Sequence, residues 1–146
     1  MHLSQLKLSN FKNYEQLHLT LSQRLNCLTG LNGMGKTNVL DAIHFLCLCK
    51  NHTGLNDRQL VRHNETFFRI EGHFSTDDQV QKIAAKFQAG QRKEIERNGT
   101  PYDRLTDYIG QFPVVMIAPD DVSLVQEGSE DRRRFLDATL SQISPN

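Results

Sequence analysis

The octapeptide Gly30-Leu31-Asn32-Gly33-Met34-Gly35-Lys36-Thr37 carries three glycines, a lysine and a threonine at fixed spacing. A short apolar segment of strand length, Leu25 to Thr29, comes directly before it. From Lys36 the hydrophobic period becomes helical, and such a helix would pack its apolar face on a sheet. The residues expected on that face are Val39, Leu40, Ile43, Leu46 and Cys47. The sequence therefore predicts a strand, a glycine-rich turn and a helix, in that order.

This octapeptide matches the pattern G-x-x-x-x-G-K-[ST] at every fixed position. Glycines let the backbone wrap so that its N–H groups point at phosphate oxygens, and the helix that follows adds partial positive charge. Lys36 would reach the outer phosphates of a nucleotide, and the Thr37 hydroxyl would bind Mg²⁺. A chance match is expected in roughly half a percent of chains of this length. The predicted nucleotide contacts are Gly30, Leu31, Asn32, Gly33, Met34, Gly35, Lys36 and Thr37.

Alternating apolar residues predict strands on both sides of this unit. Leu6 and Leu8 indicate a first strand, and the segment from Leu17 to Leu21 indicates a second, joined to the first by a short connection. After the polar segment 50–64, which has one helical turn around 57–61, the two-residue period returns. It predicts strands at 68–74, 80–87 and 93–97, and Asn98-Gly99 predicts a tight turn after them.

Three further elements are expected near the end of the sequence. The segment from Arg104 to Ile109 suits a short helix, and the apolar run from Pro113 to Ile117 is typical of a strand buried on both faces. Ser129 could cap a final helix. The apolar side of that helix would consist of Phe135, Leu136, Leu140 and Ile143.

Composition limits the classes of function. With 146 residues, 38% of them hydrophobic, the chain can form one packed domain or part of a larger one. Seventeen Lys and Arg balance seventeen Asp and Glu, so no global basic charge marks it as a small DNA-binding module. The cysteines are expected to be reduced and buried: Cys27, Cys47 and Cys49. No apolar stretch approaches eighteen residues, so we expect a cytoplasmic protein without a membrane span.

Three stretches together resemble the opening of the RecF family and its structural-maintenance-of-chromosomes relatives: residues 6–14 (Leu-Lys-Leu-Ser-Asn-Phe-Lys-Asn-Tyr), the octapeptide, and residues 38–43 (Asn-Val-Leu-Asp-Ala-Ile). Three more stretches are similar to RecF family segments in the same order. They are residues 60–63 (Leu-Val-Arg-His), 118–125 (Ala-Pro-Asp-Asp-Val-Ser-Leu-Val) and 132–137 (Arg-Arg-Arg-Phe-Leu-Asp). The resemblance covers nearly the whole chain.

This resemblance implies an α/β P-loop NTPase fold of the ABC-type ATPase head. Residues 1–146 would form its N-terminal lobe, with a mixed or antiparallel sheet and the phosphate loop followed by a helix. The family implies ATP and Mg as cofactors, and a homodimer that forms around two ATP molecules. It also implies action at gaps between single- and double-stranded DNA, and recombinase loading with RecO- and RecR-type partners.

The resemblance further implies that Lys12 and Asn13 lie near the nucleotide. The alternative is a solvated turn between two strands, since such turns are ordinarily polar. Two departures from the family pattern are visible: Lys50-Asn51-His52-Thr53 stands where an arginine is frequent, and Pro119-Asp120-Asp121 stands where other ABC heads have a glutamine loop. Asp120 or Asp121 could bind Mg²⁺ or water, or could cap a helix.

Hydrolysis in relatives requires a serine signature motif, an acidic strand end and a switch histidine, all C-terminal to the segments matched here. No apolar run of four or more residues ending in Asp-Glu occurs in the 146 residues. We therefore expect this chain to be a truncated piece that binds nucleotide without turning it over.

Two other functions fit the phosphate loop. One is a small P-loop kinase or GTPase, although there the loop usually follows the first strand, whereas about thirty residues precede it here. The other is an interaction module whose loop is occupied by nucleotide but never hydrolyses it. The basic run Arg132-Arg133-Arg134 could touch DNA phosphates or a partner, or could be an ordinary solvated surface flanked by carboxylates.

Overall fold

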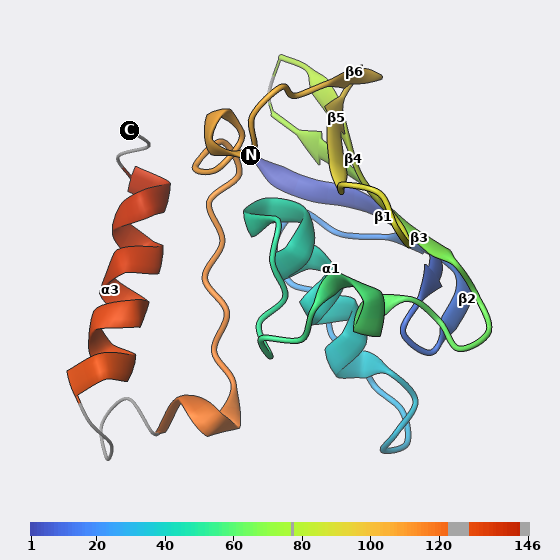
Figure 1. Cartoon of the computed structure of the whole chain (residues 1–146), viewed down its shortest axis with the longest axis horizontal. Coiled ribbons are helices and arrows are strands. Elements are labelled where there is room, and N and C mark those ends of the chain that lie inside the picture. Colours follow the sequence, from blue (N-terminus) through green and yellow to red (C-terminus); the bar gives the residue numbers. More distant parts are fainter. Residues whose placement is uncertain (77, 123–128, 144–146) are drawn as a thin grey trace.

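The computed structural model describes residues 1–76, 78–122 and 129–143 (Figure 1). These residues form one antiparallel sheet in the strand order β2-β1-β3-β4-β5-β6, with helix α1 packed on one face. The strands are β1 His2–Phe11, β2 Tyr14–Thr20, β3 Phe67–Ser75, β4 Val80–Gln88, β5 Glu94–Arg97 and β6 Thr100–Pro101. The helices are α1 Lys36–Leu48 and α3 Ser129–Ile143, with short 3-10 turns η1 Asp57–Leu60, η2 Leu105–Asp107 and η3 Pro119–Val122.

The strands form where the alternating pattern predicted them. In β3, Phe68, Ile70, Gly72 and Phe74 are buried while the residues between them are only half-buried, which is the period of a sheet with one covered face. In β1, Leu6 and Leu8 are fully buried in the same core. The predicted turn at Asn98-Gly99 is confirmed, because both residues have positive φ, 52° and 85°, and connect β5 to β6.

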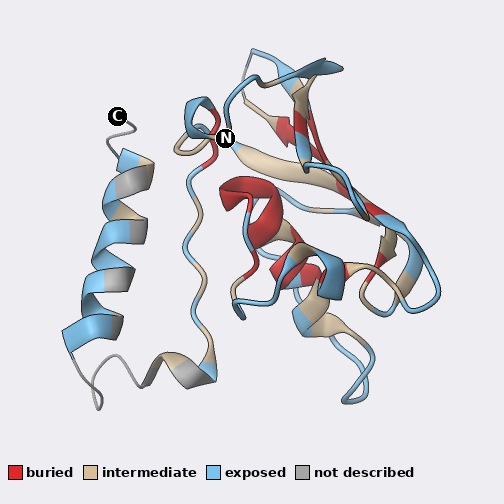
Figure 2. Cartoon of the chain, in the orientation of Figure 1, coloured by how far each residue is buried: buried red, intermediate tan, exposed pale blue. Residues whose placement is uncertain are grey.

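The core lies between α1 and the sheet (Figure 2). The Phe68 ring of β3 meets the rings of Phe11 and Phe45 edge to face, at centroid distances of 5.5 and 5.3 Å. Gly72 of β3 faces Leu46 of α1 so closely that an added Cβ would overlap the leucine methyl group. This glycine therefore allows the helix to approach the middle of the sheet.

The apolar face predicted for α1 is correct only in part. Val39, Leu46 and Cys47 are buried, but Ile43 is half-buried and Leu40 is 46% exposed. The buried surface is wider than one stripe, because the chain after α1 and the segment around Tyr108 also cover the helix. The Tyr108 hydroxyl donates a hydrogen bond to the Leu46 carbonyl oxygen. The additional buried residues are Asp41, Ala42, His44, Phe45 and Leu48.

The strand predicted at Leu25 to Thr29 is wrong. The last sheet hydrogen bond on this side runs from the Leu21 amide to the Ser4 carbonyl oxygen, 2.9 Å. Between Leu21 and α1 the chain forms no strand, and Leu25 is 84% exposed. A strand needs a neighbour to receive its hydrogen bonds, and no described residue provides one here. Cys27, expected to be buried, lies in this segment and is exposed, whereas Cys47 and Cys49 are buried as expected.

The buried strand predicted at Pro113 to Ile117 is wrong for the same reason. This segment forms no strand, and Val115 and Ile117 are 79% and 85% exposed. It runs between α1 and α3, as Figure 1 shows. The helix predicted from Arg104 to Ile109 is reduced to the single turn η2.

The final helix is confirmed as α3, which begins at Ser129. Its predicted apolar side is exposed among the described residues, and one of its polar side chains contacts the rest of the chain: Gln142 Oε1 accepts a 2.9 Å hydrogen bond from the Val114 amide. No helix in the described part of the chain is long and apolar enough to cross a bilayer.

Candidate phosphate-binding site

The octapeptide forms an exposed loop that leads into α1 (Figure 1). Gly30, Gly33 and Gly35 have positive φ values of 139°, 80° and 95°, which residues with a Cβ rarely adopt. The Lys36 ammonium bends back over the loop and donates hydrogen bonds to the carbonyl oxygens of Gly30, 2.9 Å, and Leu31, 2.7 Å. The positive charge of this lysine therefore lies within the curve of the loop.

The beginning of α1 favours an anion. Gly35 occupies the N-cap position and has no side chain to bind the free amides of the first turn, and that turn has no acidic residue. The unpaired N–H groups and the helix dipole leave a partial positive charge at this end. A phosphate group near the loop would be stabilised by both.

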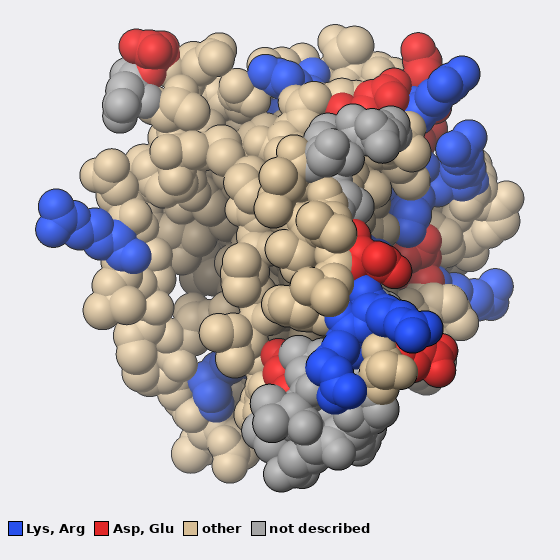
Figure 3. Space-filling model, turned by 90° about the vertical axis from the view of Figure 1, so that its left-hand side faces the viewer, with Lys and Arg blue, Asp and Glu red and all other residues tan. Residues whose placement is uncertain are grey.

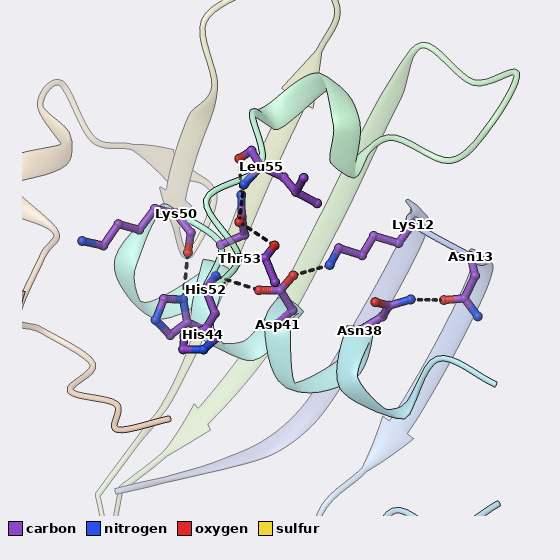
Figure 4. Close-up of polar contacts among 10 residues, drawn as sticks. Lys12, Asn13, Asn38, Asp41, His44, Lys50, His52, Thr53 and Leu55 are labelled. Atoms are coloured by element: carbon purple, nitrogen blue, oxygen red, sulfur yellow. Dashed lines mark hydrogen bonds and ion pairs between the residues drawn. The ribbon is translucent and has the colours of Figure 1, made fainter. Parts of the chain in front are cut away.

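Asn13 and Tyr14 support the loop from the β1–β2 turn. The Asn13 amide nitrogen and the Tyr14 hydroxyl each donate a 3.3 Å hydrogen bond to the Met34 carbonyl oxygen. Asn38 of α1 donates a 2.7 Å hydrogen bond to Asn13 Oδ1 (Figure 4). A Cβ on Gly35 would lie 2.5 Å from Asn13 Nδ2. The structure thus brings Asn13, which the sequence predicted near the site, into contact with the loop itself.

Lys12, the other residue predicted there, points elsewhere. Its ammonium forms an ion pair with Asp41 Oδ2 of α1, and the second oxygen of Asp41 accepts a 2.8 Å hydrogen bond from the His52 amide (Figure 4). The Lys12 and Asp41 side chains are 15% and 2% exposed. The turn is therefore fastened to α1, unlike the solvated turn considered as an alternative. A contact between Lys12 and a nucleotide stays a prediction.

Thr37 is the second residue of α1 and is exposed. The described residues contain no group of three His, Cys, Asp or Glu side chains arranged to hold a metal. Mg²⁺ in nucleotide sites is typically held by one or two protein oxygens together with phosphates and water, so a lone hydroxyl at this place fits that ion. Magnesium at Thr37 stays a prediction.

Tyr14, Asn38 and Asp41 contribute to the site although the sequence alone predicts no role for them. Asp41 did leave a signal: it is a carboxylate inside an apolar helical pattern, and a buried carboxylate needs a partner. Tyr14 and Asn38 left none, since polar residues beside a loop are ordinary. Their contacts depend on how the β1–β2 turn meets α1.

Asp121, one of the two carboxylates considered for metal binding, contacts residues outside the octapeptide. Asp121 Oδ2 accepts a 2.6 Å hydrogen bond from the Ala118 amide, and its Oδ1 lies 3.9 Å from His52 Nε2. The side chain of Asp120 and residues 123–125 lie outside the described residues. Asp121 therefore binds the backbone at the start of η3 and lies near His52, and its binding of Mg²⁺ or water stays a prediction.

Arg132 and Arg133 are exposed on α3, and the side chain of Arg134 lies outside the described residues. Figure 3 shows the face that includes α3, where Lys and Arg side chains lie close to Asp and Glu. Charges of both signs are mixed there, which does not make a continuous basic patch.

Burial shifts the pKa values of three residues in and just after α1: His44, Cys47 and Cys49. It lowers the pKa of His44, whose Nδ1 donates a 2.9 Å hydrogen bond to the Lys50 carbonyl oxygen. It raises the pKa of Cys47 and of Cys49 to about 12. These thiols stay protonated at neutral pH and are poor nucleophiles.

Comparison with known proteins shows which proteins this chain is similar to. Residues 2–124 match the family described as RecF/RecN/SMC N terminal domain. The chain is 43% identical over 143 residues to the DNA replication and repair protein RecF of Phocaeicola vulgatus, covering 97% of this chain and 38% of that protein. It is 41% identical over 143 residues to the protein of the same name from Flavobacterium johnsoniae, covering 98% and 40%. It therefore spans about two fifths of the length of these relatives.

Solved structures agree with this fold. The chain superposes on the recombination mediator protein RecF with ATP, of the RecFOR pathway, with a TM-score of 0.91 and 31% identity, covering 99% of this chain and 40% of that one. It superposes on an SMC ATPase studied for ATP-driven dimerization with a TM-score of 0.72, covering 94% and 99%. At 20% identity the second match shows the fold alone. The predicted fold class, an α/β lobe of an ABC-type ATPase head, is confirmed, and the chain belongs to the RecF/RecN/SMC N-terminal domain family.

Proposed function

We propose that residues 1–146 are the ATP-binding N-terminal lobe of a RecF-like DNA replication and repair protein. The observation that carries this proposal is the phosphate loop, where Lys36 and the uncapped start of α1 meet. Relatives named RecF, one of them solved with ATP, support ATP as the ligand.

Each part of the loop has a task in binding. Lys36 would exchange the two carbonyl oxygens that it now contacts for oxygens of the outer phosphates, which carry more charge. The loop amides and the first turn of α1 would bind the remaining phosphate oxygens. Mg²⁺, held at Thr37, would neutralise part of the phosphate charge.

Asn13 would act on the loop itself. By binding the Met34 carbonyl oxygen and Asn38, it holds the backbone between Gly33 and Lys36 in its curve. Preformed loops of this kind bind more tightly because less conformational entropy is lost on binding. We also propose that Lys12 lies near the nucleotide. Only the resemblance to the family supports this.

In the longer protein we propose an ATP-dependent homodimer of such heads, acting in the cytoplasm at gaps between single- and double-stranded DNA. We further propose that the longer protein helps to load a recombinase, together with RecO- and RecR-type partners, during the response to DNA damage. The RecFOR pathway named for the solved relative supports partners of this kind. Arg132 and Arg133 are exposed side chains that could contact DNA or a partner.

Family membership favours this function over a small P-loop kinase or GTPase. Two antiparallel strands, β1 and β2, come before the loop, and β1 lies inside the sheet. The third possibility, an interaction module that binds nucleotide without hydrolysis, shares the same site and differs only in turnover.

The test is calorimetric titration of the full-length protein with Mg-ATP, comparing wild type with Lys36→Ala. Losing a charge-assisted hydrogen bond to phosphate should raise Kd by about 10- to 100-fold. Lys50→Ala is the matched control, because it removes an exposed lysine just beyond the same helix. Equal affinity of the wild type and Lys36→Ala would refute the proposed site.

A further inference from the structure

Asp41 is a buried carboxylate on the side of α1 that faces the β1–β2 turn. Both of its oxygens are bound: Oδ2 by the Lys12 ammonium and Oδ1 by the His52 amide (Figure 4). A buried charge is costly unless it is paired. Burying a carboxylate at position 41 therefore costs free energy of desolvation, although α1 does not need a charged residue there in order to form.

The turn that Asp41 holds has a strained backbone. Lys12 has a φ of 51° and Asn10 a φ of 52°, values that residues with a side chain seldom adopt. Such conformations persist only where the surroundings fix them. Two hydrogen bonds fix the backbone here: the Lys12 amide to the Leu60 carbonyl oxygen, 2.7 Å, and the Arg62 amide to the Asn10 carbonyl oxygen, 2.8 Å. The ion pair to Asp41 fixes the side chain.

Asn13 follows Lys12 directly, and it binds the phosphate loop at the Met34 carbonyl oxygen, as the neighbouring Tyr14 hydroxyl also does. A change in the backbone at Lys12 would move Asn13 away from the Met34 carbonyl oxygen and from Asn38. The space is narrow, because a Cβ on Gly35 would lie only 2.5 Å from Asn13 Nδ2. The position of the loop therefore depends on the position of this turn.

We infer that Asp41 is a positioning residue for the phosphate loop: by holding Lys12 it fixes the β1–β2 turn, through which Asn13 braces the loop at Met34 and Gly35. The inference rests on the proposed nucleotide binding. It gives the Lys12–Asp41 pair a purpose beyond stability, since the pair acts on a ligand that neither residue needs to touch.

The test measures the affinity of the full-length protein for Mg-ATP by calorimetry. Asp41→Asn keeps the size of the side chain and the acceptor for the His52 amide, but removes the charge that holds Lys12. We expect Kd to rise on the order of tenfold, as when the supporting partner of a ligand-binding residue is lost. Lys12→Met removes the same pair from its less buried side and should give the same rise. If Asp41→Asn does not fold, Lys12→Met combined with Asn13→Ala gives the same comparison, because a separate contact of Lys12 with the nucleotide would multiply the effect of Asn13→Ala.

A second measurement separates positioning from mere stability. If the effect passes through Asn13, then Asp41→Asn combined with Asn13→Ala should bind no more weakly than the weaker single variant. Multiplied effects of the two substitutions would overturn the inference. Glu96→Gln is the matched control: it breaks another half-buried ion pair, Lys86–Glu96 between β4 and β5, away from the loop. It should lower Tm and leave Kd unchanged.

The outcomes distinguish the two proposals. Wild-type affinity in both Asp41→Asn and Lys12→Met would overturn the positioning role and leave the nucleotide site intact. Absence of Mg-ATP binding by the wild-type protein would overturn the proposed function, and the positioning role with it.

Discussion

Gly35 meets two separate requirements at one position. Its φ of 95° lies in the region that L-residues avoid, and it gives α1 an N-cap without a side chain. A Cβ there would also lie 2.5 Å from Asn13 Nδ2. The glycine of the sequence motif is therefore needed for backbone conformation and for the close approach of the β1–β2 turn.

Replacing Gly35 with alanine should weaken nucleotide binding more than it weakens the fold. Asn13 would have to move, and with it the hydrogen bond to Met34, so we expect Kd for Mg-ATP to rise about tenfold, or about 1.4 kcal/mol. Gly54→Ala is the control, because Gly54 also has positive φ, 73°, but has nothing within 4 Å of the added Cβ. Calorimetry and thermal melting of both variants check this. Equal Kd values for the two variants would contradict it.

Among the elements, α1 and β3 determine the core together. Leu46 lies over Gly72, and Phe45 meets Phe68 edge to face. The same helix carries the beginning of the phosphate loop site at one end and Asp41 on its side. Packing of α1 on the sheet therefore also sets where the loop lies relative to the β1–β2 turn.

Two leucines of α1 give a matched test of this packing. Leu46→Ala removes a fully buried side chain and should lower the free energy of unfolding by about 2–5 kcal/mol. Leu40→Ala, on the partly exposed side of the same helix, should cost less than about 1 kcal/mol. Urea denaturation followed by circular dichroism measures both. Similar losses for the two variants would mean that the helix is packed differently.

At the scale of the whole molecule, apolar side chains are exposed in two segments that the sequence pattern assigned to a strand or a packed helix. Val115 and Ile117 are exposed in the segment before η3, and Phe135, Leu136 and Leu140 are exposed on α3. The core between α1 and the sheet is complete without them. They should therefore add little to the stability of these 146 residues.

The same replacement at two isoleucines tests this. In the 146-residue chain, Ile117→Ser should change the free energy of unfolding by less than about 0.5 kcal/mol, as at other exposed positions. Ile83→Ser, in the core of β4, should cost about 3 kcal/mol or more. The measurement is urea denaturation. A large loss for Ile117→Ser would show that the segment is buried in solution, as the sequence pattern had suggested.

Much of the fold could be predicted from local pattern, because the strands β1 to β4 and the helices α1 and α3 each follow a hydrophobic period. The segments 25–29 and 113–117 were mispredicted, since a strand needs a hydrogen-bonding neighbour and the hydrophobic pattern does not say whether one is present. In the candidate site, the eight loop residues could be named from the sequence, whereas the bracing contact of Asn13 and the role of Asp41 could not.

The order of amino acids alone predicts the phosphate loop, because its glycines, Lys36 and Thr37 are neighbours whose chemistry depends on local backbone shape. It also establishes which stretches are strands and helices wherever the period is long enough. Folding in space decides what supports the loop: Lys12 and Asp41 are 29 positions apart, and Asn13 and Met34 are 21 apart. The burial of a side chain and the identity of its hydrogen-bonding partner depend on such distant residues. A local sequence pattern therefore does not reveal them.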